Sequence, residues 1–185
     1  QLSLLLRNAK KHHDNPEFQQ DMLDTIEHAV GRMNSMLLQL RSGTQPIEQA
    51  APVALTPLLE RLHRARVRSA CALELDAEGG LFIRAHEDRI ERVVGHLVQN
   101  ALDATPQNGK VSIRARRDGD GVVVEVEDSG CGMTEEFVRE RLFKPFQSTK
   151  ANGMGIGAYE SFRYIQDLGG RIEVDSEPGR GSLFR

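Results

Sequence analysis

The sequence predicts an α/β protein in which a helical hairpin precedes a two-layer α/β sandwich with a mixed, mostly antiparallel sheet. Three observations lead to this prediction. Residues 1–42 carry apolar side chains at helical spacing. Beyond residue 52, short runs of alternating apolar residues are separated by turn residues, which is typical of strands. Helical patterns are interleaved among these strands without regular alternation, which disfavours a parallel, doubly wound sheet.

The composition is that of an ordinary globular domain. The chain has 185 residues, enough for one good domain and a small appendage. Hydrophobic residues make up 39% and charged residues 28%, and a formal charge of -3 offers no basic surface for nucleic acid. Cys71 and Cys131 are too few for a disulfide framework or a zinc site, which favours a reducing, cytosolic environment.

The first residues predict a helix that is already under way. Residues 1–6 show helical spacing without an N-cap, so we expect the chain to be part of a longer one. No apolar run approaches the roughly 18 residues that span a bilayer. Membrane attachment is therefore expected only through preceding residues.

Two helices are predicted before residue 42. The first covers residues 1–13 and breaks at Asp14-Asn15-Pro16; the second begins there, with Asn15 as N-cap, and runs to about Arg41. In the second helix, apolar residues step alternately by four and three: Met22, Ile26, Ala29, Met33, Met36 and Leu40. A flanking row widens this face beyond the need of a two-stranded coil: Leu23, Val30 and Leu37.

Such a wide face suits a four-helix bundle, of which two helices make only half. We therefore expect a homodimer in which each chain contributes one helical hairpin. The alternative is an amphipathic hairpin that packs on its own domain.

Residues 43–52 have the composition of a linker, with Gly43, Pro46 and Pro52. A second domain is predicted at residues 53–185. It should open with a short strand at 53–54 and a helix from Thr56 to about Arg68. Strands are then expected at 71–76 and 81–84, paired as a hairpin around Glu78-Gly79-Gly80.

The remaining elements follow in order. A helix is predicted from about Glu87 to Thr105, and a hairpin pairs residues 111–116 with 122–127 around a Gly-rich turn. Thr134 should cap a short helix with Glu135 and Glu136 in its first turn. A helix at 158–168 and strands at 171–175 and 182–185 complete the domain.

Four motifs lie between residues 94 and 157. The first ends a predicted helix, and the others occupy predicted loops: Gln99-Asn100-Ala101-Leu102-Asp103-Ala104, Asp128-Ser129-Gly130-Cys131-Gly132-Met133, Phe143-Lys144-Pro145-Phe146 and Gly153-Met154-Gly155-Ile156-Gly157. Taken singly, each has a common structural explanation, such as a solvated helix Asn or a glycine loop. Their joint order and spacing is much more specific.

In that order, the motifs resemble the N, G1, F and G2 boxes of the Bergerat ATP-binding fold of the GHKL family, over residues 53–185. Gyrase, Hsp90, the MutL proteins and sensor histidine kinases share this fold, and the F box is found in the kinases. The resemblance implies a two-component sensor histidine kinase: its catalytic domain and part of its dimerisation helices.

The resemblance also implies roles for the first motif. Asn100 would be the magnesium ligand, because a side-chain amide can offer an oxygen to a cation that also binds nucleotide phosphates. His96 stands where gyrase-like ATPases carry a catalytic Glu, and its lack of a carboxylate favours transfer over hydrolysis. A role in catalysis is left open for His96. A nucleotide contact is left open for Asp103, since many kinases have a basic residue at this position.

The second motif would bind the base of ATP. Asp128 should accept a hydrogen bond from the exocyclic amine of adenine, which selects adenine over guanine. Gly130 and Gly132 would let the backbone approach the base. Met133 would lie against the purine face, or else pack in the core below the loop.

Residues 147–157 would form a short ATP lid. Gly153, Gly155 and Gly157 allow backbone N–H groups to turn toward phosphate at the start of a helix. Lys150 is the lid cation expected to reach the β or γ phosphate, with a solvated lysine as the alternative. Phe143 and Phe146 would pack the lid against the sheet or the helical hairpin. Phe146 is also expected to contact the nucleotide.

The sequence thus predicts a histidine kinase core that binds ATP and Mg²⁺ and transfers the γ-phosphoryl group to a His. A receiver-domain Asp of a response regulator would accept it next. In the family the acceptor His stands on the first dimerisation helix before an acidic residue. His13-Asp14 is the nearest match, but Asn15-Pro16 follows it, so we expect the acceptor upstream of Gln1.

This assignment implies a cytoplasmic domain of a membrane-associated bacterial kinase. Three alternatives stay open: a GHKL-type ATPase or ATP-gated clamp, a degenerate kinase that serves as a dimeric scaffold, and an anti-sigma-factor serine kinase.

Overall fold

The structure is a computed structural model that describes residues 50–66, 71–145, 147 and 155–185, together with Phe18, Met22, Leu23, Thr25 and Ile26. The chain divides into two compact units, Gln1–Ile47 and Glu48–Arg185. Among the described residues, none of the helices is both long and apolar enough to cross a bilayer.

The five described residues of the first unit are all helical, as predicted for the helix from Asn15 to about Arg41. Leu23 and Ile26, both on the predicted apolar face, are exposed. The rest of the predicted hairpin and residues 43–49 of the predicted linker lie outside the described residues. The homodimer therefore stays a prediction.

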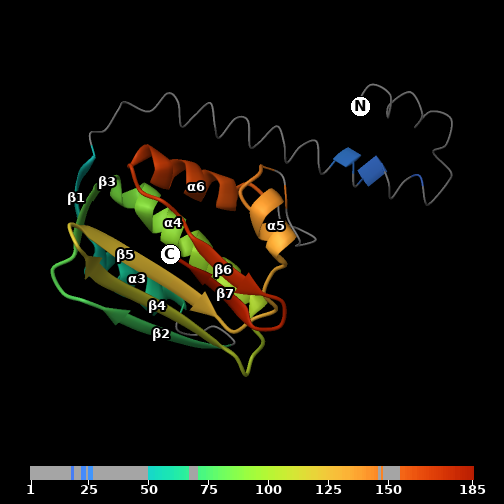
Figure 1. Cartoon of the computed structure of the whole chain (residues 1–185), viewed down its shortest axis with the longest axis horizontal. Coiled ribbons are helices and arrows are strands. Elements are labelled where there is room, and N and C mark those ends of the chain that lie inside the picture. Colours follow the sequence, from blue (N-terminus) through green and yellow to red (C-terminus); the bar gives the residue numbers. More distant parts are fainter. Residues whose placement is uncertain are drawn as a thin grey trace. The chain divides into compact units, whose positions relative to one another are not determined.

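The second unit is built on a mixed five-stranded sheet with the strand order β2-β4-β5-β7-β6 (Figure 1). Its strands are β2 (Ala72–Ala77), β4 (Lys110–Asp118), β5 (Gly121–Asp128), β6 (Val174–Glu177) and β7 (Gly181–Phe184). Only β2 and β4 are parallel; the other neighbours are antiparallel. A separate two-stranded sheet pairs β1 (Ala51–Ala54) with β3 (Phe82–Ala85).

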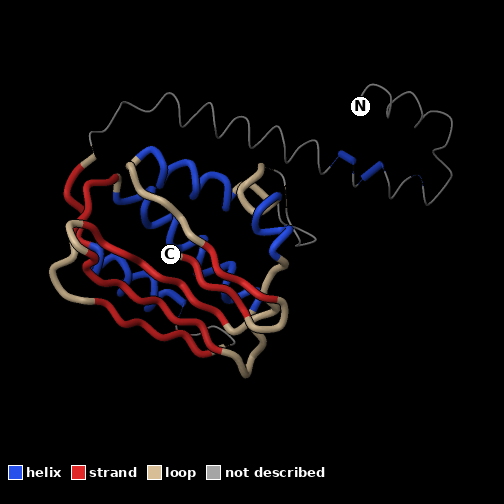
Figure 2. The backbone as a smooth tube through the Cα atoms, in the orientation of Figure 1, coloured by secondary structure: helices blue, strands red, loops and turns tan. Residues whose placement is uncertain are grey.

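Helices cover one face of the large sheet, so the unit has the two layers that the sequence predicts (Figure 2). They are α3 (Leu55–Arg66), α4 (Glu87–Ala104) and α6 (Gly157–Asp167), while the short α5 (Glu135–Glu140) follows the loop after β5. The Thr134 hydroxyl accepts the N–H of Phe137 at 3.2 Å, which confirms the predicted N-cap of α5.

The core lies between the helices and the sheet. Apolar residues at helical spacing on α3 and α4 meet every second residue of the central strands. The buried set includes Leu55, Leu58, Leu59, Leu62, Ile90, Val94, Val98, Ala101, Val111, Ile113, Ala115 and Val126. This packing holds α4, and the motif that it carries, firmly above β4 and β5.

The predicted hairpin of residues 71–76 and 81–84 is wrong. β2 pairs in parallel with β4, and β3 pairs with β1 instead. The N–H of Glu78 donates to Ala115 O at 2.9 Å, and its carbonyl oxygen accepts the Thr56 hydroxyl at 2.6 Å. Because Glu78 is tied to β4 on one side and to α3 on the other, the chain leaves the large sheet there and does not fold back.

Other boundaries differ by a few residues. β1 begins at Ala51, inside the predicted linker, and β6 begins at Val174, three residues after the predicted start. Glu173 and Arg185 still exchange two backbone hydrogen bonds, at 2.8 and 2.9 Å, just outside β6 and β7. The predicted hairpin of β4 and β5 is confirmed, with Asp118 opposite Gly121 at its end.

Candidate functional site

Asp128 ends β5 with a buried side chain, 6% exposed. Its Oδ1 accepts the N–H of Gly130 at 2.8 Å, and Ser182 of β7 lies opposite Asp128 in the ladder. Burial raises the pKa of the Asp128 carboxyl, and hydrogen bonding from Gly130 and Ser182 opposes that rise. The N–H of Gly130 thus helps to orient the carboxylate.

The loop after Asp128 packs on the C-terminal end of α4. The N–H of Cys131 donates to Ala104 O at 3.2 Å, and a Cβ at Gly130 would overlap that same carbonyl group. Glycine is therefore required at position 130 by a close approach of backbone to backbone. One turn of α4 separates Ala104 from Asn100, so the first two motifs meet at this end of the helix.

Gly132 and Met133 lie against the strand β6. Gly132 has a φ of +63°, and a Cβ there would overlap the carbonyl of Glu177. The Met133 side chain is half-buried, and its N–H donates to the Ser176 hydroxyl at 2.8 Å. The protein's own backbone thus supplies one reason for the second glycine, beside its predicted approach to a base.

His96 and Asn100 lie one turn apart on α4. Asn100 Nδ2 is 3.3 Å from Nε2 and 3.4 Å from Nδ1 of the His96 ring, and both side chains are half-buried. Gly157, the first residue of α6, is so close to the same ring that a Cβ there would overlap it. Motifs one and four are thereby brought together.

Asp103 is exposed, and its Oδ1 accepts Nε2 of Gln99 at 2.7 Å. This bond lies along α4 itself. The predicted contact between Asp103 and a nucleotide stays a prediction.

The lid is described only at its two ends. Phe146, Lys150 and Gly153 lie outside the described residues. Gly155 is described and would, with a Cβ, overlap the backbone of Gln147. Phe143 stacks on Phe162 of α6, with 4.6 Å between ring centroids. The first aromatic residue of the F motif is therefore packed on the helix that follows the lid.

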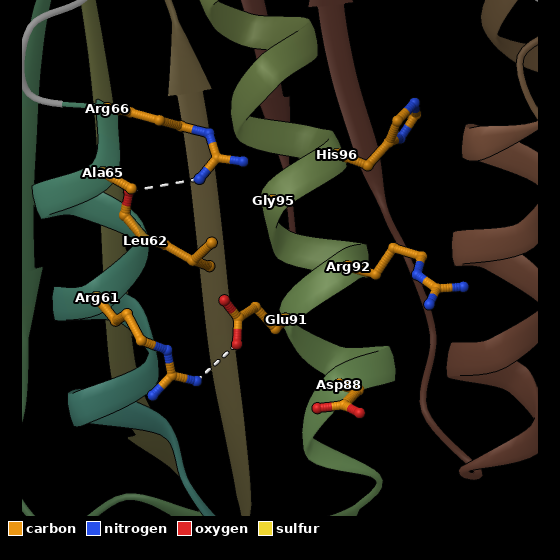
Figure 3. Close-up of a pocket in the computed structure, with 9 residues that line it drawn as sticks. All are labelled: Arg61, Leu62, Ala65, Arg66, Asp88, Glu91, Arg92, Gly95 and His96. Atoms are coloured by element: carbon orange, nitrogen blue, oxygen red, sulfur yellow. Dashed lines mark hydrogen bonds and ion pairs between the residues drawn. The ribbon is translucent and has the colours of Figure 1, made fainter.

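A groove of about 470 Å³ lies elsewhere, between α3 and α4 (Figure 3). It shares one residue, His96, with the predicted site. Two of its charged lining residues, Arg61 and Glu91, form an ion pair, because Arg61 Nη2 bridges Glu87 and Glu91 at 2.9 and 2.6 Å.

Three residues that the sequence analysis missed join the site or its frame. Ser182 lies opposite Asp128 in the sheet and contacts Ser176, and Tyr164 of α6 accepts the N–H of His86 at 2.8 Å, just before α4 begins. Within the described ranges, no group of three or more His, Cys, Asp and Glu side chains is arranged to hold a metal.

The arrangement suits a nucleotide better than a catalytic metal cluster. A buried acceptor, Asp128, can read an amine, and a helix amide, Asn100, can offer oxygen to a cation. Backbone N–H groups near the start of α6 can meet phosphate.

Comparisons with known proteins agree with this geometry. Residues 85–185 match the family described as histidine kinase-, DNA gyrase B-, and HSP90-like ATPase. The sensor histidine kinase ZraS of Klebsiella oxytoca is 36% identical over 132 residues, which are 70% of this chain and 28% of that protein. The alginate biosynthesis sensor protein KinB of Pseudomonas aeruginosa is 33% identical over 181 residues, or 89% of this chain and 29% of its own length. The chain thus spans less than a third of these relatives.

Solved structures give the same fold. The nucleotide-free catalytic domain of the histidine kinase ThkA is 30% identical with a TM-score of 0.65, and the match covers 74% of this chain and 92% of that one. A second structure holds ThkA in complex with the response regulator protein TrrA, at 24% identity and a TM-score of 0.65, over 99% of this chain and 55% of that one.

Proposed function

This chain belongs to the family of histidine kinase-, DNA gyrase B- and HSP90-like ATPases as a histidine kinase catalytic domain, and from that membership we propose how its site works. It binds ATP with magnesium between α4, the loop after β5 and the lid before α6. The contact of Gly130 with Ala104 carries the proposal, because it brings the Asp128 loop to the end of α4 that bears Asn100.

Each end of the nucleotide has its own residues. Asp128 accepts the exocyclic amine of adenine, Gly130 and Gly132 bring the loop backbone to the base, and Met133 covers its face. Asn100 offers its amide oxygen to magnesium. When bound, the ion neutralises phosphate charge.

The lid and the start of α6 would serve the phosphates. Lys150 would reach the β or γ phosphate, and Gly153, Gly155 and Gly157 would turn backbone N–H groups toward phosphate near the positive N-terminal end of α6. Phe146 and Asp103 complete the predicted set of nucleotide contacts. His96 orients Asn100 through their side-chain contact.

The reaction is transfer of the γ-phosphoryl group to a His Nε2. The bond between the γ phosphorus and the β–γ bridging oxygen breaks, a phosphorus–nitrogen bond forms, and ADP leaves. No carboxylate stands at position 96 to activate water, which favours a protein acceptor. The histidines at positions 12, 13 and 28 do not have the family context of an acceptor, so we place that His outside residues 1–185.

The partners follow from the same assignment. A response-regulator receiver Asp would take the phosphoryl group from the His, as the complex of ThkA with TrrA suggests for a relative. The helical hairpin would hold two chains together as a homodimer, and attachment to a bacterial membrane would come through other parts of a longer kinase.

Calorimetric titration with ATP and GTP, each with and without Mg²⁺, tests the binding proposal. We expect ATP to bind at least about tenfold more tightly than GTP, or about 1.4 kcal/mol, and to gain affinity from Mg²⁺. Incubation with γ-labelled ATP should give no acid-labile phosphoprotein on this chain.

The rivals give other results. Steady phosphate release without a protein acceptor would favour an ATPase or ATP-gated clamp. Failure to bind ATP would favour a dimeric scaffold.

A further inference from the structure

Two serine hydroxyls lie behind Asp128, on neighbouring strands. Ser176 of β6 and Ser182 of β7 are opposite each other in the antiparallel ladder, and their Oγ atoms are 3.0 Å apart. Ser182 is buried, and Ser176 is half-buried. The hydroxyl of one can therefore donate to the other.

These two hydroxyls have neighbours on both sides. Ser182 lies opposite Asp128 in the antiparallel ladder of β5 and β7. Either hydroxyl of the pair can donate in the contact of Ser182 with Ser176. At the other side, Ser176 Oγ accepts the N–H of Met133, which has no other role than donor.

Hydrogen bonds thus link the Met133 N–H to Ser176, and Ser176 to Ser182, which lies opposite Asp128. Gly181 O, 3.0 Å from Ser176 Oγ, is a second acceptor for the Ser176 proton and lies at the start of the same strand, β7. With either contact, Ser176 ties the Met133 loop to β7, the strand that pairs with β5 at Asp128.

We propose that Ser176 is a positioning residue for adenine selection: it joins the Met133 backbone to Ser182 and so holds the Asp128 carboxylate in place as the acceptor for the adenine amine. The inference rests on the proposed function, since it assumes that Asp128 reads the base. Ser176 itself does not touch the nucleotide.

The test compares ATP with purine riboside 5′-triphosphate, which lacks the exocyclic amine, by calorimetry in the presence of Mg²⁺. The unmodified chain should bind ATP about tenfold more tightly than the analogue, which is about 1.4 kcal/mol. In Ser176→Ala the ATP affinity should fall about tenfold while that of the analogue falls less than about threefold, so the preference is lost.

Matched variants separate positioning from folding. Ser176→Thr and Ser176→Val have nearly the same shape, and both suit a strand. Only Thr keeps the hydroxyl, so Thr should retain the preference for ATP and Val should lose it, even if Ser176→Ala fails to fold. Ser112→Ala is the control, because Ser112 is a buried serine of β4 whose neighbours Val111 and Ile113 face the core. It should leave both affinities unchanged.

An equal loss of affinity for both nucleotides in Ser176→Val would show a merely structural role and overturn the inference. Unchanged binding in that variant would overturn it as well. If the unmodified chain binds neither nucleotide, the proposed function itself fails, and the inference fails with it. Binding of both nucleotides without a preference for ATP would remove the role of Asp128 and this inference, but not nucleotide binding.

Discussion

The imidazole ring of His96 lies between Gly157 and Asn100. A Cβ at Gly157 would overlap the ring, and the ring's Nε2 is 3.3 Å from Asn100 Nδ2. The first residue of α6 therefore limits the position of His96, and His96 in turn contacts the proposed magnesium ligand. The start of the helix that follows the lid is linked in this way to the end of α4 that bears the proposed magnesium ligand.

Gly157→Ala should weaken the binding of Mg-ATP with little change in stability. The added methyl group forces the ring to rotate away, and rotation of a side chain is cheap compared with a shift of backbone. Asn100 then loses its contact with His96. We expect a decrease of about threefold to tenfold in affinity, up to about 1.4 kcal/mol, measured by calorimetry beside a thermal melt.

The double variant His96→Ala, Gly157→Ala is the control. Without the ring, the atoms nearest to the added methyl group are gone, so Gly157→Ala should have no effect on affinity in the His96→Ala background. If the loss of affinity in the double variant equals the sum of the losses in the two single variants, the two residues act separately.

Asn100→Ala should remove the magnesium-dependent part of ATP binding. Magnesium prefers oxygen ligands, and the amide is the protein oxygen proposed for it. In the unmodified chain, chelation of Mg²⁺ by EDTA should lower ATP affinity about tenfold, or about 1.4 kcal/mol; in Asn100→Ala the two titrations should agree.

Gln99→Ala is a suitable comparison, because Gln99 carries an exposed amide directly before Asn100 on the same helix and should keep the response to Mg²⁺. If Asn100→Ala keeps the full response to Mg²⁺, the amide is not the ligand.

Asp128 should give ATP binding a dependence on pH. Burial raises the pKa of this carboxyl above its ordinary value, and only the ionised form accepts the adenine amine at both oxygens. The preference for ATP over purine riboside 5′-triphosphate should therefore decrease as the pH falls through the raised pKa. Using the ratio of the two affinities cancels the titration of the phosphates.

The raised pKa of Asp128 makes stability depend on pH in the opposite direction. In the unfolded chain the carboxyl loses its proton at the lower, ordinary pKa, so between the two pKa values the folded state holds more protons. The contribution of Asp128 to the free energy of unfolding should fall as the pH rises through that window. Asp128→Asn should lack both dependences, and a preference for ATP that persists unchanged in Asp128→Asn would exclude Asp128 as the reader of the base.

Local patterns in the sequence predicted the helices and strands well, but they did not predict which strands pair when the strands lie far apart in the sequence. The hairpin of β4 and β5 is adjacent in sequence, and alternating valines with a Gly-rich turn specify it. The parallel pairing of β2 with β4 spans the whole of α4, and nothing in residues 71–84 distinguishes that partner from a nearby strand.

The same limit applies to the site. Asn100 and Asp128 were predicted because their motifs are specific, although their roles are still to be tested. Ser176 was missed because a serine in a closing strand has no distinctive pattern, and its bond to Met133 joins residues 43 positions apart. Only the repeated placement of Ser182 and Ser176 on the core-facing side of β7 and β6 could have pointed to them.

Glu125 should stabilise the fold from the other face of the sheet. Its side chain is 6% exposed, and it accepts hydrogen bonds from Arg116 at 2.6 and 3.1 Å and from Arg185 at 3.0 Å. Glu125→Gln should lower the free energy of unfolding by about 2 kcal/mol at neutral pH, since hydrogen bonds between charged groups are worth roughly 1.5–3 kcal/mol. Denaturant unfolding of the ligand-free chain measures this difference.

The pH dependence of that loss identifies its cause. The bonds with Arg116, and then those with Arg185, lower the pKa of Glu125 below its ordinary value. A lowered folded pKa gives stability that is present above the ordinary pKa and disappears as the pH falls through the lowered one. The difference between the unmodified chain and Glu125→Gln should therefore shrink in acid. Glu127→Gln, on the same face of β5 with a side chain 45% exposed, should cost less than about 1 kcal/mol, because its pair with Arg114 is open to solvent. Equal losses of stability in the two variants would contradict the inference that burial strengthens the hydrogen bonds of Glu125.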